Sequence, residues 1–149
     1  MAELRRIVDS VAAEAIASAE AGSCAHPWSA AMYADSIAGQ DLVFAYHLAP
    51  EQAIGFAVLL QVLDEAHLQN VFVCQPWQRQ GHGRQLLQQL MQYAASQGAS
   101  RMLLEVRESN HAARQLYLSC GFSETGRRKH YYRTADGPRE HAILMEAPL

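Results

Sequence analysis

The feature that most constrains the fold is a glycine-rich loop between an apolar run and a long amphipathic repeat. Residues 67–73 have the composition of a strand and end just before Pro76. From Gly83 onward, apolar residues recur at helical spacing until Gly98 stops the pattern. Residues 102–106 then form a second apolar run of strand length. A strand, a helix and another strand in this order predict one parallel crossover in the sheet.

Other elements are expected on both sides of this unit. They are helices at 7–22, 29–37 and 110–121, antiparallel strands at 42–46 and 54–60, a third strand at 67–73, and a terminal hairpin within 122–149 turning at Asp136-Gly137. These elements predict a mixed α/β, or α+β, fold with a central, mixed, mostly antiparallel sheet of about six to seven strands and about four helices. One domain over residues 1–149 is the default for this length, because no repeat or linker interrupts the chain.

Composition narrows the class of function. The chain is 50% hydrophobic and 18% charged, which favours a compact fold, and its net charge of -3 argues against direct nucleic-acid binding. The basic cluster at 127–133 is interpreted as a solvated hairpin face. Three cysteines without a CxxC pair and seven histidines without i,i+4 spacing predict neither a disulfide framework nor a metal site. Since no apolar run approaches a membrane span, we expect a cytoplasmic protein without a membrane partner.

The loop reads Gln78-Arg79-Gln80-Gly81-His82-Gly83-Arg84 and opens the best predicted helix. Free amides at a helix N-terminus favour a phosphate, and the two arginines add positive charge beside them. The glycines let the backbone turn tightly and approach a ligand. The loop has neither the GxGxxG spacing of a dinucleotide-binding fold nor the GKS or GKT of a Walker loop, which leaves the pattern QxxGxG. Taken alone, this pattern also fits an ordinary helix-entry turn.

A second block begins in the strand predicted at 102–106. It reads Leu103-Leu104-Glu105-Val106-Arg107, then Ser109-Asn110, Ala112-Ala113, Leu116-Tyr117 and Gly121-Phe122. With the QxxGxG loop, this block resembles the GNAT superfamily of N-acetyltransferases. Within that superfamily the chain resembles the RimI-type ribosomal-protein-alanine N-acetyltransferases, which share His26-Pro27-Trp28-Ser29, Leu63-Asp64-Glu65-Ala66 and the Tyr131-Tyr132 tail. The resemblance covers roughly residues 26–147 and implies a GNAT fold.

The resemblance implies a role for each residue of the pattern. It makes Glu105 the proton acceptor, Tyr117 the proton donor and Asn110 a contact to acetyl-CoA, the expected co-substrate, with no metal. It assigns the acetyl and pantetheine portion to the backbone of Val71, Phe72 and Val73, and the pyrophosphate to Arg79, Gln80, Gly81, His82, Gly83 and Arg84. Without the resemblance, the residues favour an exposed strand-end carboxylate for Glu105 and a core-edge aromatic for Tyr117. Cys74 departs from the family, which usually has an acidic residue there; it is interpreted as a small turn residue rather than a covalent relay.

The implied reaction is direct acetyl transfer, in a ternary complex, to the N-terminal alanine of a small-subunit ribosomal protein, the expected partner. An α-amino group, with a pKa of about 7.7–8.0, is neutral at pH 7 far more often than lysine, at about 10.4, and so demands less of Glu105. Two alternatives stay open: a GNAT enzyme acting on a small amine or on protein lysine, and a non-catalytic acetyl-CoA-binding module. Weak association with other proteins stays open as well.

Overall fold

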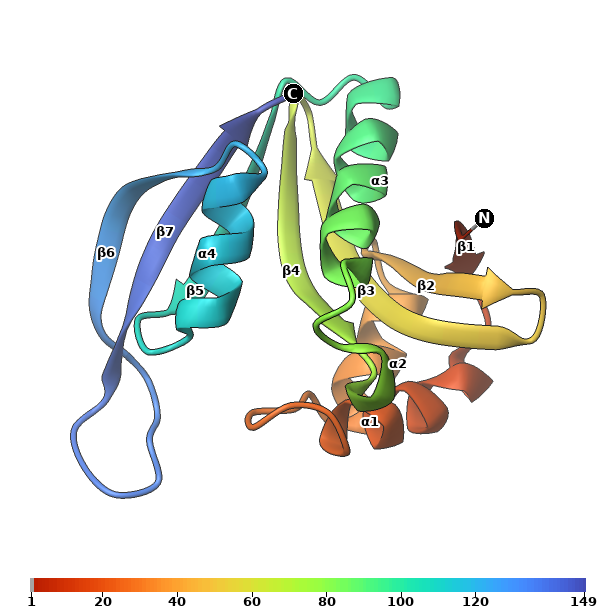
Figure 1. The fold of residues 1–149 in the computed structure, drawn as a ribbon, viewed down its shortest axis with the longest axis horizontal. Helices are drawn as coiled ribbons and strands as arrows, with labels where there is room; N and C mark the ends of the chain where they lie inside the picture. Colours follow the sequence, from red (N-terminus) through yellow and green to blue (C-terminus); the bar gives the residue numbers. More distant parts are fainter. Residues whose placement is uncertain (1) are drawn as a thin grey trace.

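The computed structural model describes residues 2–149, which form one mixed sheet with helices on both faces (Figure 1). The strands are β1 (Glu3–Ile7), β2 (Leu42–Ala49), β3 (Gln52–Val62), β4 (Glu65–Val73), β5 (Arg101–Arg107), β6 (Ser123–Tyr132) and β7 (Glu140–Pro148). The helices are α1 (Ala13–Ala21), α2 (Ala30–Ala38), α3 (His82–Ser96) and α4 (His111–Ser119), with short 3-10 turns η1 (Ser10–Ala12) and η2 (Gln75–Trp77).

The sheet has seven strands in the order β1-β2-β3-β4-β5-β7-β6. β4 and β5 pair in parallel, and every other neighbouring pair is antiparallel. The parallel pair is joined through α3, which confirms the predicted crossover. The predicted hairpin at the end of the chain is also confirmed, since β6 and β7 pair on either side of Asp136-Gly137.

Local signals in the sequence explain where the helices begin and end. The Ser29 side chain accepts a hydrogen bond from the amide of Met32 and caps α2. In the same way, Asn110 caps α4 through the amide of Ala113. At the end of α3, Gly98 takes a positive φ of 91° that a residue with a side chain adopts only under strain. The predictions for α2, α3 and α4 are therefore confirmed.

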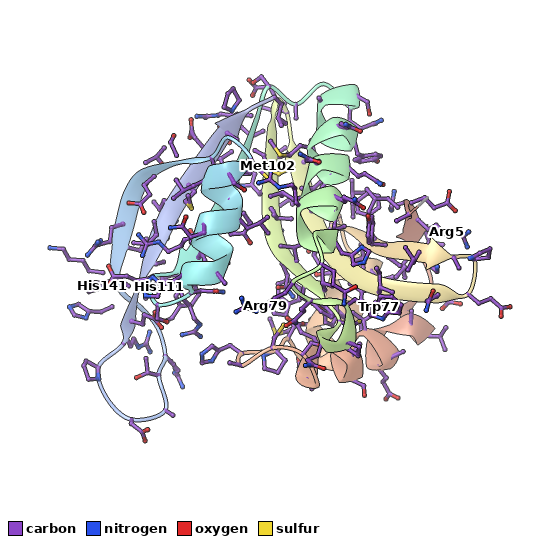
Figure 2. The ribbon with its side chains drawn as sticks, viewed as in Figure 1. Arg5, Trp77, Arg79, Met102, His111 and His141 are labelled. Carbon is purple, nitrogen blue, oxygen red and sulfur yellow. The ribbon has the colours of Figure 1, made fainter. Side chains whose placement is uncertain are left out.

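Two buried clusters cover the two faces of the sheet. β2 shows the alternation directly, because Phe44 and Tyr46 pack into one cluster while Val43 and Ala45 pack into the other. The first cluster contains the apolar face of α3, Tyr117 of α4 and the fully buried Met102, which lies between these two helices in Figure 2. The second cluster contains the buried residues of α1 and α2. Helices α3 and α4 therefore cover one face, and α1 and α2 cover the other.

The prediction of one helix over residues 7–22 is wrong at its N-terminal end. Ile7 belongs to β1, an edge strand that pairs with β2, and the α-helix begins only at Ala13. The physical reason is Asp9, whose side chain accepts a hydrogen bond from the amide of Val11 and caps η1. The backbone can turn into a helix only after this cap, so the residues before it are free to pair with β2.

A bulge in β4 opens the sheet at its centre. Val58 pairs with Asn70 and Leu59 pairs with Leu68, so Gln69 is an extra residue on β4. The pairing of β4 with β5 stops at the same point, because its last partners are Leu68 and Leu104. Beyond it the two strands separate, as Figure 1 shows. The open edge that results positions the candidate site.

Candidate active site

A cleft of about 990 Å³ lies at the opening between β4 and β5. Its walls come from the α1–α2 loop, the middle of β4, the end of β5, α4 with the residues just before it, and the end of β6. Four of the residues singled out in the sequence line it together: Val71, Glu105, Asn110 and Tyr117. Val71 comes from β4, whereas the other three come from the continuous β5–α4 segment, so the opening between β4 and β5 is what brings them into one site.

The open edge of β4 carries unpaired backbone groups. The amide of Cys74 donates to the carbonyl of Ile54, and hydrogen bonds alternate along an antiparallel strand. Given the register of β3 and β4, the backbone groups of Phe72 therefore turn toward β3, whereas those of Val71 and Val73 turn toward the open edge. The carbonyl of Val73 accepts from Gln78 Nε2 at 2.9 Å. The rest of this edge can pair with an extended ligand as an added strand would.

The glycine-rich loop has a shape that suits a diphosphate. Arg79 and Gly81 both take left-handed conformations, with φ of 60° and 87°. The first helical hydrogen bond of α3 runs from the amide of Gln85 to the carbonyl of Gly81, so the amides of the intervening first turn have no acceptor within the helix. Arg79 lies with Trp77 at this end of α3 (Figure 2). Free amides, a positive helix end and exposed arginines together fit an anionic group.

Gly83 shows which elements surround the loop. A Cβ at this position would lie 3.4 Å from Leu116 Cδ2 and 4.0 Å from Val73 Cγ2. The first turn of α3 therefore approaches α4 and the end of β4 closely. This packing places the loop next to the open edge of β4, so that one extended ligand can contact both.

Asn110 has a structural task besides the predicted contact to acetyl-CoA. Its side-chain oxygen accepts the amide of Ala113 and caps α4. A contact from this side chain to a ligand in the cleft would therefore use its amide nitrogen, which is a donor.

Glu105 lies near the end of β5 on the partly exposed face of that strand. The burial of β5 alternates, with Leu104 and Val106 buried on the other face. The Glu105 carboxylate pairs with Arg128 Nε at 3.0 Å, and the exposed fraction of its side chain is 30%. A carboxylate that lines a cleft and keeps access to solvent can accept a proton from a bound amine, directly or through one water.

Two tyrosines complete this end of the cleft. Burial raises the pKa of Tyr117, which is only 8% exposed and packs against Phe122. Burial also raises the pKa of Tyr132 to about 12, and the nearby Glu105 carboxylate adds to the shift. The guanidinium of Arg107 lies 4.4 Å from the centre of the Tyr132 ring. Because both phenols keep their protons at neutral pH, each can act as a hydrogen-bond donor in the cleft.

Cys74 is not an activated nucleophile. It is a partly buried residue between β4 and η2, and burial raises the pKa of its thiol. The neighbouring Cys24 has a pKa raised to about 11, mainly by burial and next by Glu20. A raised pKa lowers the thiolate fraction at neutral pH, which disfavours a covalent relay.

Sequence reasoning missed two charged residues of the cleft region. Arg128 lies on β6 and reaches Glu105 across β7, a contact that depends on the strand order. Glu20 lines the cleft and is 2% exposed. The signal for Glu20 was present in the sequence, since it follows the buried Ile16 by one helical turn on the apolar face of α1.

Two further observations concern the described part of the chain only. In residues 2–149, no cluster of three His, Cys, Asp or Glu side chains could hold a metal ion. Over the same residues, the longest apolar helical stretches are too short to cross a membrane.

Comparisons with known proteins point to one family. Residues 13–122 match the model of the acetyltransferase (GNAT) family. The chain is 43% identical, over 84% of its own length and 83% of the relative's, to the [ribosomal protein bS18]-alanine N-acetyltransferase of Escherichia coli K12. The protein of that name from Haemophilus ducreyi is 38% identical over 80% of this chain and 81% of its own. The crystal structure of the ribosomal-protein-S18-alanine N-acetyltransferase from Escherichia coli superposes with a TM-score of 0.88, covering 99% of this chain and 94% of that one at 38% identity.

Proposed function

The chain belongs to the GNAT family of acetyltransferases, and on that premise we propose that it acetylates the N-terminal alanine of the ribosomal protein bS18. The protein is an acetyl-CoA-dependent N-acetyltransferase. This choice of acceptor comes from relatives whose names state the activity and which match four fifths of the chain or more. Since bS18 is a ribosomal protein, the reaction would take place in the cytoplasm.

Acetyl-CoA supplies the activated acetyl group as a thioester. In this proposal the backbone of Val71 and the amide of Val73, which face the open edge, hold the acetyl and pantetheine portion, and the first turn of α3 with Arg79 and Arg84 holds the pyrophosphate. Gln80, Gly81, His82 and Gly83 complete that loop, while Phe72 supports the edge from the β3 side. Asn110 contributes a donor at the start of α4.

Glu105 and Tyr117 have complementary tasks at the reacting end of the cleft. A protonated amine cannot attack a thioester, so Glu105 removes its proton. The departing thiolate of CoA needs a proton, and in this proposal the protonated phenol of Tyr117, which lines the cleft, donates it. Because the Cys74 thiol is poorly ionised, transfer runs directly from the thioester to the amine in a ternary complex.

One observation carries this proposal. The carboxylate and the phenol expected for acid–base chemistry line the same cleft, next to an unpaired strand edge and a helix N-terminus suited to a pyrophosphate. An enzyme acting on a small amine or on lysine would need the same donor site. The identity to bS18-specific relatives over most of the chain favours the α-amine.

A set of three peptides tests the acceptor. The first begins with a free alanine, the second has the same sequence with a blocked N-terminus, and the third is blocked but contains lysine. Mass spectrometry after incubation with acetyl-CoA should find a single acetyl group on the first peptide alone. Labelling of the lysine peptide would indicate the alternative acceptor, and binding of acetyl-CoA without any transfer would indicate a non-catalytic module.

A further inference from the structure

A buried carboxylate with no charged partner lies in the wall of the acceptor cleft. Glu20, near the end of α1, is 2% exposed and lines the cleft together with Trp28 and Asn70. Among residues 2–149, no Lys, Arg or His side chain forms an ion pair with it. Burying a charge is costly unless hydrogen bonds compensate for the lost water, so the donors around Glu20 are the feature to explain.

Three neutral donors satisfy this carboxylate, and they come from three different parts of the fold. The backbone amide of Trp28, in the α1–α2 loop, donates to Oε1 at 3.1 Å. The hydroxyl of Tyr33, on α2, donates to the same oxygen. The side-chain amide of Asn70, on β4, donates to Oε1 at 3.2 Å and to Oε2 at 3.0 Å. Glu20 thus connects the loop and α2 to the strand whose edge opens the site.

The hydrogen bond from the Trp28 amide to Glu20 is important because few other hydrogen bonds hold the α1–α2 loop. For residues 25–28 of the described chain, the amide of Trp28 is the one backbone group that hydrogen-bonds to the rest of the protein. Ser23 anchors the start of the loop through Gln75 and Gln78. Ser29 anchors its end by capping α2. The middle of the loop, which forms a wall of the cleft, depends on Glu20.

Asn70 gives the cluster a link to the donor side of the site. It follows the bulged Gln69 on β4 and precedes Val71, whose backbone faces the open edge. The bond from Asn70 to Glu20 therefore sets the distance between the loop on one wall and the open strand on the other. An acceptor that enters between them meets a gap whose width this bond determines.

We propose that Glu20 is a positioning residue for the acceptor: its carboxylate holds the α1–α2 loop, through Trp28, against β4, through Asn70, and so shapes the acceptor half of the cleft. The inference rests on the proposed function, because it takes the cleft to be the acceptor site. Glu20 does not touch the reacting atoms. Its loss therefore affects how well the acceptor binds and leaves the chemical step to Glu105 and Tyr117.

The test compares steady-state kinetics of the full-length protein and Glu20→Gln, with an alanine-initiated peptide and acetyl-CoA varied in turn. Glutamine keeps the shape of the side chain but replaces one carboxylate oxygen with an NH2 group, which cannot accept a hydrogen bond from a neighbouring donor. We expect the KM for the peptide to rise about tenfold, as for the loss of one charge-assisted hydrogen bond. Both kcat and the KM for acetyl-CoA should stay within about twofold of the parent, because neither reports on the acceptor wall.

A second substitution makes the test specific to this contact. In Glu20→Gln, the new Nε2 faces Asn70 Nδ2, which is also a donor. Adding Asn70→Asp supplies an acceptor there and should restore most of the peptide KM. Ser36→Ala is the matched control, since it removes a hydrogen bond to Asp41 from α2 without touching the Glu20 cluster. This control should leave the peptide KM unchanged.

The outcomes separate the inference from the proposed function. Two results would overturn the role of Glu20 while the function stands. One is a change in kcat and in the KM for acetyl-CoA as large as the change in the peptide KM. The other is a lower melting temperature with an unchanged peptide KM. A parent protein that acetylates no peptide would instead overturn the function. If Glu20→Gln does not fold, Tyr33→Phe removes one donor while keeping the ring, and an unchanged peptide KM in that variant would also overturn the inference.

Discussion

Arg128 on β6 reaches across β7 and pairs with Glu105 on β5, with Nε 3.0 Å from Oε1. The Arg128 side chain is 56% exposed, so solvent screens this pair. In the proposed mechanism, the incoming amine needs the same carboxylate. Arg128 contacts only Oε1, so the amine can use Oε2 or displace Arg128, and an exposed pair can be broken at little cost.

Substitutions of these two residues should have very different effects. We expect Glu105→Gln to lower kcat/KM for the peptide about a hundredfold or more, because it removes the proposed general base. Arg128→Ala should change the same quantity by less than about fivefold, since an exposed ion pair contributes roughly 0–1 kcal/mol. Steady-state kinetics at one pH and ionic strength measures both. Equal losses in the two variants would mean that the ion pair itself is required for the reaction.

Tyr117→Phe tests the proposed proton donor. Removing the hydroxyl should lower kcat about a hundredfold, whereas the Kd for acetyl-CoA, measured by calorimetry, should stay nearly constant. Tyr93→Phe is the matched control, because that ring packs against Phe44 and does not line the cleft. If kcat is the same in Tyr117→Phe as in the parent, another group protonates the leaving thiolate.

The role of Gly81 at the start of α3 can be distinguished from that of Gly98, which follows its end. Gly81 and Gly98 have φ of 87° and 91°, and neither has an atom within 4 Å of an added Cβ. Valine at either position should therefore destabilise the fold by a similar amount, about 1–3 kcal/mol, through backbone strain. Only Gly81→Val should also weaken acetyl-CoA binding, by about tenfold or more, because it distorts the loop at the pyrophosphate. Equal affinities in the two variants would contradict the loop assignment.

Much of the fold could be predicted because its signals are local. The helical repeat before Gly98 and the caps at Ser29 and Asn110 are readable in the sequence, and the structure confirms them. β1 was not predicted, because a short charged segment becomes an edge strand only through its pairing with β2. The bulge at Gln69 has no local signal either, since it reflects the register between β3 and β4.

The candidate site also contains residues that could be predicted from the sequence and residues that could not. Glu105, Asn110 and Tyr117 are predicted from a resemblance that covers a contiguous block, and all three line the cleft. The Arg128 contact was not predictable, because it depends on β7 inserting between β5 and β6. The environment of Glu20 depends on how α1 packs against β4, which the sequence of α1 does not specify.

The tyrosines predict how stability depends on pH. The pKa of Tyr132 is raised to about 12, chiefly by burial, and those of Tyr33, Tyr46 and Tyr117 are raised as well. An unfolded tyrosine ionises near pH 10, so above that pH the unfolded chain loses protons that the folded protein retains. The free energy of unfolding should be undiminished by these groups below about pH 10 and should fall as pH rises above it. Urea unfolding between pH 8 and 11 measures this, and Tyr132→Phe should make the fall shallower. A constant free energy across this range would contradict the prediction.

The central claim is tested most directly on the whole acceptor protein. Unmodified bS18 from the same genome is incubated with acetyl-CoA and either the parent enzyme or Glu105→Gln, and peptide mapping by tandem mass spectrometry locates the acetyl groups. We predict one acetyl group, on the N-terminal alanine, with the parent enzyme and almost none with the variant. Acetylation of lysine side chains, or no acetylation of bS18 by a parent enzyme that binds acetyl-CoA, would contradict the account.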